Sequence, residues 1–211
     1  MRRDFVRKRQ SADSRGAKPQ QPEQKKRKLV CENSQFNIFF DELTSQGRTT
    51  IRDYLVVAPK RVAANLVTGV AILPIVDGKI GLIRIYRHPI GQYSWEIPRG
   101  FIDRQEVSAS AAGRELKEET GLDCKSEAIR SLGFITPDGG ILAARVQLFA
   151  ATECAKEREY APAEIGHREL RFFNIQEVEE MISRSEVQDP STVIAFFMYS
   201  RFENQTLDGP V

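Results

Sequence analysis

One 23-residue segment, GFIDRQEVSASAAGRELKEETGL (100–122), constrains the fold of this chain more than any other. Its first residues lack periodicity and predict a loop, and the sequence that follows predicts a helix over about 108–120. Gly121 stands where a glycine that terminates a helix is expected. The segment therefore predicts a loop, a helix and a sharp exit. The small and apolar residues of the helix mark its buried face, and they are Ala109, Ala112, Gly113 and Leu116.

The same helix carries three glutamates. Glu115 lies one turn before both Glu118 and Glu119, so the three carboxylates share one side of the helix. Like charges at this spacing repel by roughly 0.2–0.5 kcal/mol per pair. The cluster is therefore either an ordinary solvated acidic face or a site for a cation.

The clearest hairpin signal precedes this segment. The apolar runs 67–76 and 79–87 flank Asp77-Gly78, a dipeptide that supplies the positive φ angles of a tight turn. Further strands are predicted at 35–42 and 50–57, joined by a turn at Gly47, and at 92–98, 129–136, 143–151 and 170–175.

Two more helices are predicted near the C-terminus. One covers about 176–184, and the last begins with Asp189 as its N-cap and Pro190 as its first residue. The charged segment 153–167 is interpreted as a loop. A mostly antiparallel or mixed sheet flanked by a few helices belongs to the α/β (α+β) class and predicts a layered α/β sandwich, with additional antiparallel strands at its N-terminal side.

Charge is distributed unevenly along the chain. Residues 1–28 contain eleven Lys or Arg and three Asp or Glu, a net charge of +8, whereas the remaining residues contain 20 and 26, a net charge of −6. The basic segment is also rich in Gln, Ser and Pro, which predicts disorder. It is interpreted as a solubilising extension or as a contact for nucleic acid or another anionic partner. The expected divisions are a tail over 1–28, N-terminal strands over 29–62, a main domain over 63–204 and a flexible C-terminus over 205–211.

Composition limits the compartment and the chemistry. No run of 18 apolar residues is present, which argues against a membrane span, and the first 28 residues lack the apolar core of a secretory signal. Cys31, Cys124 and Cys154 are far apart in the sequence and show no CxxC spacing. His88 and His167 add no ligand-like pattern. Neither a disulfide framework nor a zinc site is expected, and a reducing cytoplasm fits best.

The segment 100–122 also matches the pattern G-x5-E-x7-R-E-U-x-E-E-x-G-U, where U is a bulky aliphatic residue. Seven invariant and two aliphatic positions agree, and an accidental match has odds on the order of one in 10⁷. This pattern is the Nudix box, and the chain resembles the Nudix hydrolases over about 30–203. The matching residues are Gly100, Glu106, Arg114, Glu115, Leu116, Glu118, Glu119, Gly121 and Leu122.

Three carboxylates on one helix face provide the oxygen ligands that Mg²⁺ prefers, and bound ions would neutralise a diphosphate and activate water. The resemblance implies that Glu115 and Glu119 are the principal ligands of Mg²⁺, with Mn²⁺ as a substitute. It also implies that Glu118 and the backbone carbonyl of Arg99 complete the metal sites. Arg114 is expected to pair with Glu106 and to fix the loop.

A second resemblance, in the segment before the box, implies which residues contact the substrate. The run RIYRHPIGQYSWEIPRGF (84–101) is similar to a segment of the ADP-ribose and nucleotide-sugar pyrophosphatases of this family. Arg87 and Glu96 match substrate-facing positions there, although Arg87 also fits an exposed strand end. Pro137, in a turn 15 residues after the box, resembles a mark of the ADP-ribose pyrophosphatases, although it also fits a simple hairpin turn. The N-terminal strands resemble a dimerisation element, through which Arg52 would reach the site of a second copy.

Water attack also requires a general base. In the resembling enzymes this base is often a glutamate in the loop before the last sheet strand, here 156–170. Glu164 is the first choice and Glu169 the second, and a glutamate of the box, Glu118, is the remaining alternative.

These observations predict a Mg²⁺-dependent enzyme that cleaves ADP-ribose or a related nucleoside diphosphate sugar into a nucleoside monophosphate and a sugar phosphate. The expected assembly is a cytoplasmic homodimer with a small-molecule substrate. Two alternatives remain at this stage. One is a pyrophosphohydrolase of capped or 5′-triphosphorylated RNA, and the other is a catalytically silent module that senses a nucleotide.

Overall fold

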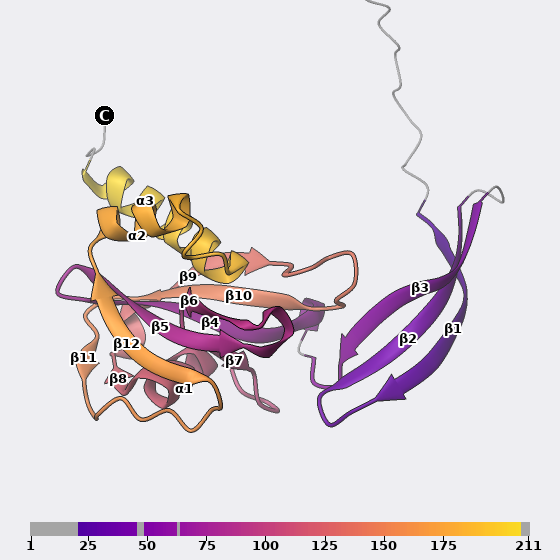
Figure 1. Ribbon diagram of the computed structural model, residues 1–211, viewed down its shortest axis with the longest axis horizontal. Coiled ribbons are helices and arrows are strands. Elements are labelled where there is room, and N and C mark those ends of the chain that lie inside the picture. Colours follow the sequence, from indigo (N-terminus) through magenta and orange to yellow (C-terminus); the bar gives the residue numbers. More distant parts are fainter. Residues whose placement is uncertain (1–20, 46–48, 63, 208–211) are drawn as a thin grey trace, which may run out of the picture.

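The chain forms an α/β/α sandwich with a second, smaller sheet beside it (Figure 1). The structure is a computed structural model that describes residues 21–45, 49–62 and 64–207. A mixed seven-stranded sheet forms the middle layer of the sandwich. A separate antiparallel sheet of three strands stands at its N-terminal side. The predicted fold class is confirmed.

The predicted hairpin forms the centre of the main sheet. Strands β4 (Val67–Val76) and β5 (Lys79–Arg87) are joined at Asp77 and Gly78, which have φ angles of 49° and 72°. These positive angles are what the Asp-Gly dipeptide predicted. Strand β4 is buried along nearly its whole length, so it forms the axis of the core.

The main sheet has the strand order β12-β5-β4-β10-β9, while β6 pairs with β5 and β7 pairs with β4. Only the contact between β4 and β10 is parallel among these pairs. The two shortest strands form a separate pair, β8 with β11. The bounds of these strands are Gln92–Glu96 for β6, Arg99–Phe101 for β7, Leu122–Asp123 for β8, Ile129–Ile135 for β9, Arg145–Ala151 for β10, Ala155–Lys156 for β11 and His167–Phe173 for β12.

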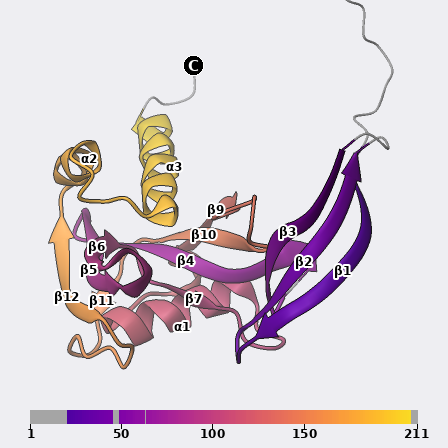
Figure 2. The same ribbon diagram turned by 45° about the vertical axis from the view of Figure 1, so that its right-hand side comes forward.

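Helices cover both faces of this sheet (Figure 2). Helix α1 (Ser108–Thr120) packs on one face, and α2 (Ile175–Ser183) and α3 (Pro190–Leu207) pack on the other. Each face has its own apolar cluster, because the side chains of neighbouring strand residues point to opposite sides. Short 3₁₀ turns occur at Ala64–Leu66, His88–Ile90 and Ser126–Ala128.

Both predicted helix boundaries of functional interest are confirmed. Gly121 ends α1 in the left-handed conformation with a φ of 74°. A Cβ at this position would also lie 2.6 Å from the carbonyl oxygen of Arg158, so glycine is required there for two reasons. Asp189 caps α3, because its carboxylate accepts the backbone N–H of Thr192 at 2.9 Å.

The N-terminal sheet consists of β1 (Glu23–Glu32), β2 (Phe36–Ser45) and β3 (Thr49–Pro59), paired in that order. Backbone hydrogen bonds attach β3 to the main body, where Val57 bonds with Ile141 and Ala143 at 2.9 Å each. The predicted strands 35–42 and 50–57 correspond to β2 and β3. The turn predicted at Gly47 lies outside the described residues.

Strand β1 was not predicted, and it corrects the expected tail boundary. Six residues assigned to the tail, 23–28, belong to this strand, while residues 1–20 lie outside the described part of the chain. Lysine and glutamate are depleted in strands, so the sequence of β1 gave little sign of its structure. Tertiary contacts override that propensity, because Arg27 donates to both oxygens of the buried Asp41 on β2 at 2.8 and 2.7 Å.

The C-terminal boundary also differs from the prediction. Helix α3 continues to Leu207, three residues into the segment expected to be flexible, and residues 208–211 are not described. Within the described ranges, none of the helices combines the length and apolar character needed to cross a membrane.

Candidate active site

Arg114 holds the loop that precedes α1 against the helix. Its Nε and Nη2 atoms donate to the two carboxylate oxygens of Glu106, each at 3.0 Å, and Nη2 also donates to the carbonyl oxygen of Phe101 at 3.0 Å. These hydrogen bonds lower the pKa of Glu106, so the pair stays ionised at neutral pH. The geometry agrees with the bracing role expected for Arg114.

The same guanidinium contacts two glutamates of the acidic cluster. Its Nη1 atom donates to Glu115 at 2.7 Å and to Glu118 at 3.0 Å. Glu115 is buried, whereas the side chain of Glu118 is 56% exposed. Burial raises the pKa of Glu115 to about 7, although the contact with Arg114 opposes this shift. The three glutamates are therefore unequal, and Glu118 is the one that faces solvent.

The two buried glutamates meet the backbone of β7. A Cβ at position 100 would overlap the carboxyl group of Glu115, so Gly100 is needed for this close approach. Glu119 is 4% exposed, and its Oε2 accepts the backbone N–H of Arg99 at 2.9 Å. Two buried carboxylates supply the oxygen ligands that a divalent cation prefers. The residues present therefore fit a divalent metal ion.

These glutamates line a cavity of about 530 Å³. Its wall is mixed, because it contains three arginines and three glutamates together with several apolar side chains. The polar lining includes Arg87, Arg99, Arg114, Glu115, Glu119 and Glu164, and the apolar lining includes Phe36, Phe101, Pro137, Leu142 and Val146. The cavity thus combines charged and apolar side chains, and Phe36 is contributed by the N-terminal sheet.

A buried charge network borders the cavity. Arg87 donates to both carboxylate oxygens of Glu96 at 2.9 and 2.6 Å, and Glu96 is 3% exposed. Arg99 joins the same carboxylate at 3.0 Å and also donates to Asp189, the N-cap of α3, at 2.8 Å. The Arg99 side chain therefore links β6 to α3, a structural role that its sequence position did not reveal.

Replacing Arg99 with Ala is expected to lower the free energy of unfolding by about 2–3 kcal/mol, because Glu96 and Asp189 would each lose a charged partner while remaining buried. Arg99→Lys should recover part of this loss, because one ammonium group cannot contact both acids in the same way. Urea unfolding of the purified variants measures the effect.

The control for this prediction is Arg61→Ala. Arg61 pairs with Asp103 at 3.0 Å, but both side chains are more than half exposed, so its loss should cost less than about 1 kcal/mol. Equal destabilisation by the two substitutions would contradict the structural role of Arg99.

The remaining predicted substrate residues lie in different places. Pro137 lines the cavity. Arg52 is exposed on β3 and is absent from the lining of the cavity in this single chain. An exposed side chain at this position can contact a second copy of the chain.

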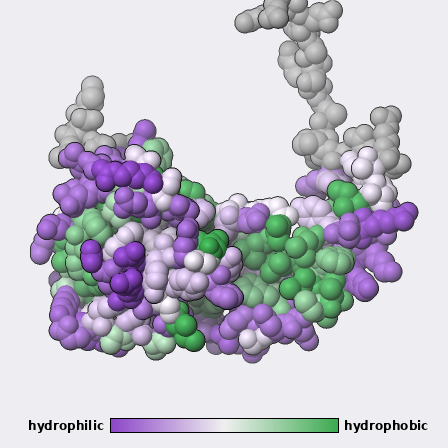
Figure 3. Space-filling model, viewed as in Figure 1, coloured by the Kyte–Doolittle hydropathy of each residue, from purple (hydrophilic) through white to green (hydrophobic). Residues whose placement is uncertain are grey.

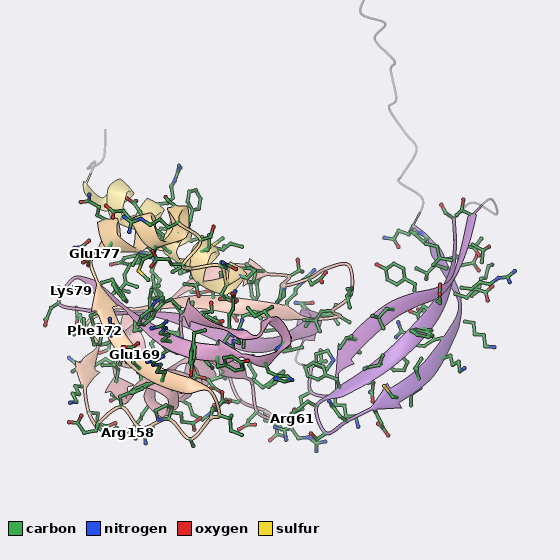
Figure 4. All side chains as sticks on the ribbon, viewed as in Figure 1. Arg61, Lys79, Arg158, Glu169, Phe172 and Glu177 are labelled. Carbon is green, nitrogen blue, oxygen red and sulfur yellow. The ribbon has the colours of Figure 1, made fainter. Side chains whose placement is uncertain are left out.

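The two candidates for the general base are separated by the sheet. Glu164 lines the cavity, and its side chain is 67% exposed. Glu169 instead lies on β12, where it pairs with Arg84 at 3.4 Å and with Arg171 at 2.6 Å (Figure 4). Of these two glutamates, only Glu164 is close to the acidic cluster.

A β-bulge explains this separation. On β12, His167 pairs with Ile85 and Glu169 pairs with Arg84, so one residue is inserted between them relative to the partner strand. Without the bulge, positions 167 and 169 would lie on the same face of the sheet. With it, His167 lies on the face covered by α1, and Glu169 lies on the opposite face beside Arg84.

His167 is the residue of this site that the sequence did not reveal. Its side chain is 1% exposed, and its Nε2 atom lies 3.6 Å from Glu119 Oε1 and 3.7 Å from Glu164 Oε2. On the other side of the ring, Nδ1 lies 3.4 Å from the hydroxyl of Tyr160, whose pKa burial raises to about 12. The strand prediction began three residues too late, at Leu170, so the histidine was assigned to a loop and no signal placed it in the core.

Comparisons with known proteins agree with this architecture. The NUDIX domain profile matches residues 65–193. A methanol dehydrogenase activator from Bacillus methanolicus is 29% identical over 150 residues, which is 71% of this chain and 76% of that protein. An ADP-ribose pyrophosphatase from Bacillus subtilis is 29% identical over 142 residues, which is 65% of this chain and 75% of that protein.

A solved structure shows the same fold. The crystal structure of an ADP compounds hydrolase superposes with a TM-score of 0.76 at 20% sequence identity, covering 93% of this chain and 100% of the other. This similarity therefore includes the N-terminal sheet as well as the sandwich. Because the NUDIX profile matches more than half of the chain and four residues of the box, Gly100, Arg114, Glu115 and Glu119, line one cavity, the chain belongs to the Nudix family of pyrophosphohydrolases.

Proposed function

We propose that this enzyme hydrolyses the diphosphate linkage of ADP-ribose or a related nucleoside diphosphate sugar, giving a nucleoside monophosphate and a sugar phosphate. One observation carries the proposal: the cavity joins the buried carboxylates Glu115 and Glu119 to an apolar wall that includes Pro137. A diphosphate fits beside the charged side chains when cations are bound there, and a nucleoside fits against the apolar side chains. The Bacillus subtilis relative, named an ADP-ribose pyrophosphatase, supports this substrate class.

Nudix hydrolases use a divalent metal ion, and we propose Mg²⁺ for this enzyme, with Mn²⁺ as a substitute. Glu115 and Glu119 would be the main ligands, and Glu118 and the carbonyl oxygen of Arg99 would complete the sites. When bound, the cation supplies charge neutralisation and activation of water. Arg114 keeps the loop and the carboxylates in place through its five hydrogen bonds with Glu106, Phe101, Glu115 and Glu118.

Arg87 is proposed to contact a phosphate group of the substrate. Two of its five N–H donors point to Glu96, which orients the guanidinium and leaves donors for a phosphate oxygen. Glu96 acts through this arginine and is a positioning residue. The rings of Phe36 and Phe101 stand 6.1 Å apart at the edge of the cavity and offer an aromatic surface for the nucleobase.

Glu164 is proposed as the general base, because it lines the cavity whereas Glu169 lies on the other face of the sheet. The carboxylate of Glu164 would accept the proton of the attacking water. Its exposed position on the segment before β12 allows it to approach a bound substrate.

A hydrolysis screen tests the substrate assignment. The purified enzyme is incubated with Mg²⁺ or Mn²⁺ and with ADP-ribose, GDP-mannose, UDP-glucose, NADH, dinucleoside polyphosphates or capped RNA, and the products are separated by ion-exchange chromatography. We expect AMP and ribose 5-phosphate from ADP-ribose at the highest kcat/KM. A preference of more than tenfold for capped RNA would reject the proposal.

Hydrolysis of RNA is the second candidate function, and the basic charge of residues 1–28 favours it. Because β1 begins at Glu23, a deletion of residues 1–20 removes most of that charge without cutting the strand. An RNA hydrolase should lose RNA affinity in this deletion. An enzyme of nucleotide sugars should keep its kcat/KM for ADP-ribose.

We propose that the N-terminal sheet mediates a cytoplasmic homodimer. Hydrophobic side chains are exposed on this sheet (Figure 3), and they include Leu29, Val30, Phe40, Ile51 and Leu55. Exposed apolar surface of this kind is typical of a protein interface. The three free thiols support the reducing compartment. Light scattering at micromolar concentration should give about twice the chain mass of 23.9 kDa, and a mass of one chain would reject the dimer.

A further inference from the structure

The imidazole of His167 has an unsatisfied nitrogen inside the site. Among the described residues, Nε2 of His167 is one of two buried side-chain polar atoms without a hydrogen-bond partner. An unpaired buried polar atom costs about 1–3 kcal/mol, so such atoms are rare in folded proteins. This atom points between Glu119 and Glu164, two glutamates that come from different elements. Three potential ligand atoms from different parts of the fold therefore converge on one point.

The distances fit a shared cation. Glu119 Oε1, Glu164 Oε2 and His167 Nε2 all lie within 4.8 Å of one another. With metal–ligand bonds of about 2.1 Å, two ligands of one ion stand about 3.0 Å apart at a right angle and about 4.2 Å apart when opposite. The observed separations from Nε2 of 3.6 and 3.7 Å fall between these limits.

The neighbouring contacts leave these atoms available. Glu119 uses its other oxygen, Oε2, to accept the backbone N–H of Arg99, so Oε1 faces the histidine. The hydroxyl of Tyr160 lies on the Nδ1 side of the ring, where it orients the imidazole without occupying Nε2. Direct hydrogen bonds from Nε2 to the two carboxylates are excluded, because 3.6 and 3.7 Å are too long for them.

We propose that Glu119, Glu164 and His167 bind one divalent cation, and that the imidazole ligand makes this position favour Mn²⁺ over Mg²⁺. Mg²⁺ prefers oxygen ligands, whereas first-row transition metals accept imidazole nitrogen readily. This inference rests on the proposed use of Glu119 as a metal ligand, and it adds a position beyond the glutamates of the box. One oxygen of Glu164 can bind the cation while the other accepts a proton, so the two roles proposed for Glu164 are compatible.

The chain offers a matched control, because it contains only two histidines, His167 and His88. His88 is exposed in the turn after β5 and is absent from the cavity lining. Electron paramagnetic resonance of bound Mn²⁺, recorded with pulsed detection of ¹⁴N couplings, reports directly whether an imidazole nitrogen is a ligand. We expect this coupling in the wild type and in His88→Gln, and its loss in His167→Gln.

Titration with Mn²⁺ and Mg²⁺ provides the second measurement. His167→Gln should weaken Mn²⁺ binding by at least about tenfold and leave Mg²⁺ binding nearly unchanged. Glu164→Gln replaces an exposed side chain, so it tests the site even if His167→Gln fails to fold. It should weaken Mn²⁺ binding while the nitrogen coupling remains.

The outcomes separate this inference from the proposed function. Bound Mn²⁺ without a ¹⁴N coupling in the wild type, or a coupling that persists in His167→Gln, would overturn the inference even if ADP-ribose is hydrolysed. A coupling that depends on His167, found in an enzyme that does not hydrolyse ADP-ribose, would support the inference and reject the substrate assignment.

Discussion

Glu119→Gln is expected to lower kcat for ADP-ribose by at least 100-fold while the protein remains folded. Glu119 is buried at the end of α1. Its Oε2 accepts the backbone N–H of Arg99, and its Oε1 lies 3.6 Å from Nε2 of His167. An amide has the same shape and can still accept the Arg99 N–H, but it carries no charge and binds a divalent cation weakly. The loss should therefore come from metal-dependent stabilisation of the transition state and not from unfolding.

Steady-state kinetics at saturating metal, together with thermal unfolding, measure this effect. Glu157→Gln is the matched control, because Glu157 pairs with Lys117 of α1 through exposed side chains outside the cavity. The control should keep a kcat within about twofold of the wild type, since exposed ion pairs contribute little. Near-normal turnover of Glu119→Gln would reject the proposed metal ligand.

Glu164→Gln should lower kcat by about 100- to 1000-fold, as expected when a general base is removed. Its side chain is 67% exposed, so the change in unfolding free energy should stay within about 0.5 kcal/mol. The KM for ADP-ribose should change less than kcat, because the base acts on water and contributes little to substrate binding.

Glu169→Gln distinguishes the two candidates for the base. Glu169 pairs with Arg84 and Arg171 on the sheet face opposite the acidic cluster, so its loss should reduce kcat much less than the loss of Glu164. The reverse order of effects, measured in the same assay, would assign the base to Glu169 and would require a rearrangement of β12 during the reaction.

Features that depend on neighbours in the sequence were predicted well. The Asp77-Gly78 turn, the C-terminal glycine of α1 and the Asp189 cap of α3 are determined by backbone conformation and hydrogen bonds within a few residues. Such local preferences act wherever the segment lies in the fold. The positions of β4, β5 and α1 were therefore correct to within about one residue.

Elements that owe their structure to distant contacts were missed or shortened. Strand β1 has a sequence that disfavours strands, and it is held by pairing with β2 and by the contact of Arg27 with Asp41. Strand β12 begins three residues before the predicted start. The pairing of His167 with Ile85 extends the strand into the segment that was predicted to be a loop. Propensity is a weak guide when a partner strand supplies the hydrogen bonds.

The acidic cluster itself was determined by the sequence, because helix geometry alone brings Glu115, Glu118 and Glu119 to one side of α1. The difference in their solvent exposure was decided only by the tertiary structure, which buries Glu115 and Glu119 against β7 and leaves Glu118 exposed. The contact between Arg114 and Glu106 was also predictable from the spacing of the box, because only a short loop and part of one helix separate the two residues.

The rest of the site comes together over long sequence distances. Arg99 donates a hydrogen bond to Asp189, which is 90 residues away in the sequence. Glu119 of α1 lies close to His167 because β12 pairs with β5 and directs His167 to the sheet face that α1 covers. A single inserted residue on β12 decides whether His167 lies on the sheet face that α1 covers. The side-chain period of a strand is two, so this bulge reverses the faces, and no local pattern in the sequence records it.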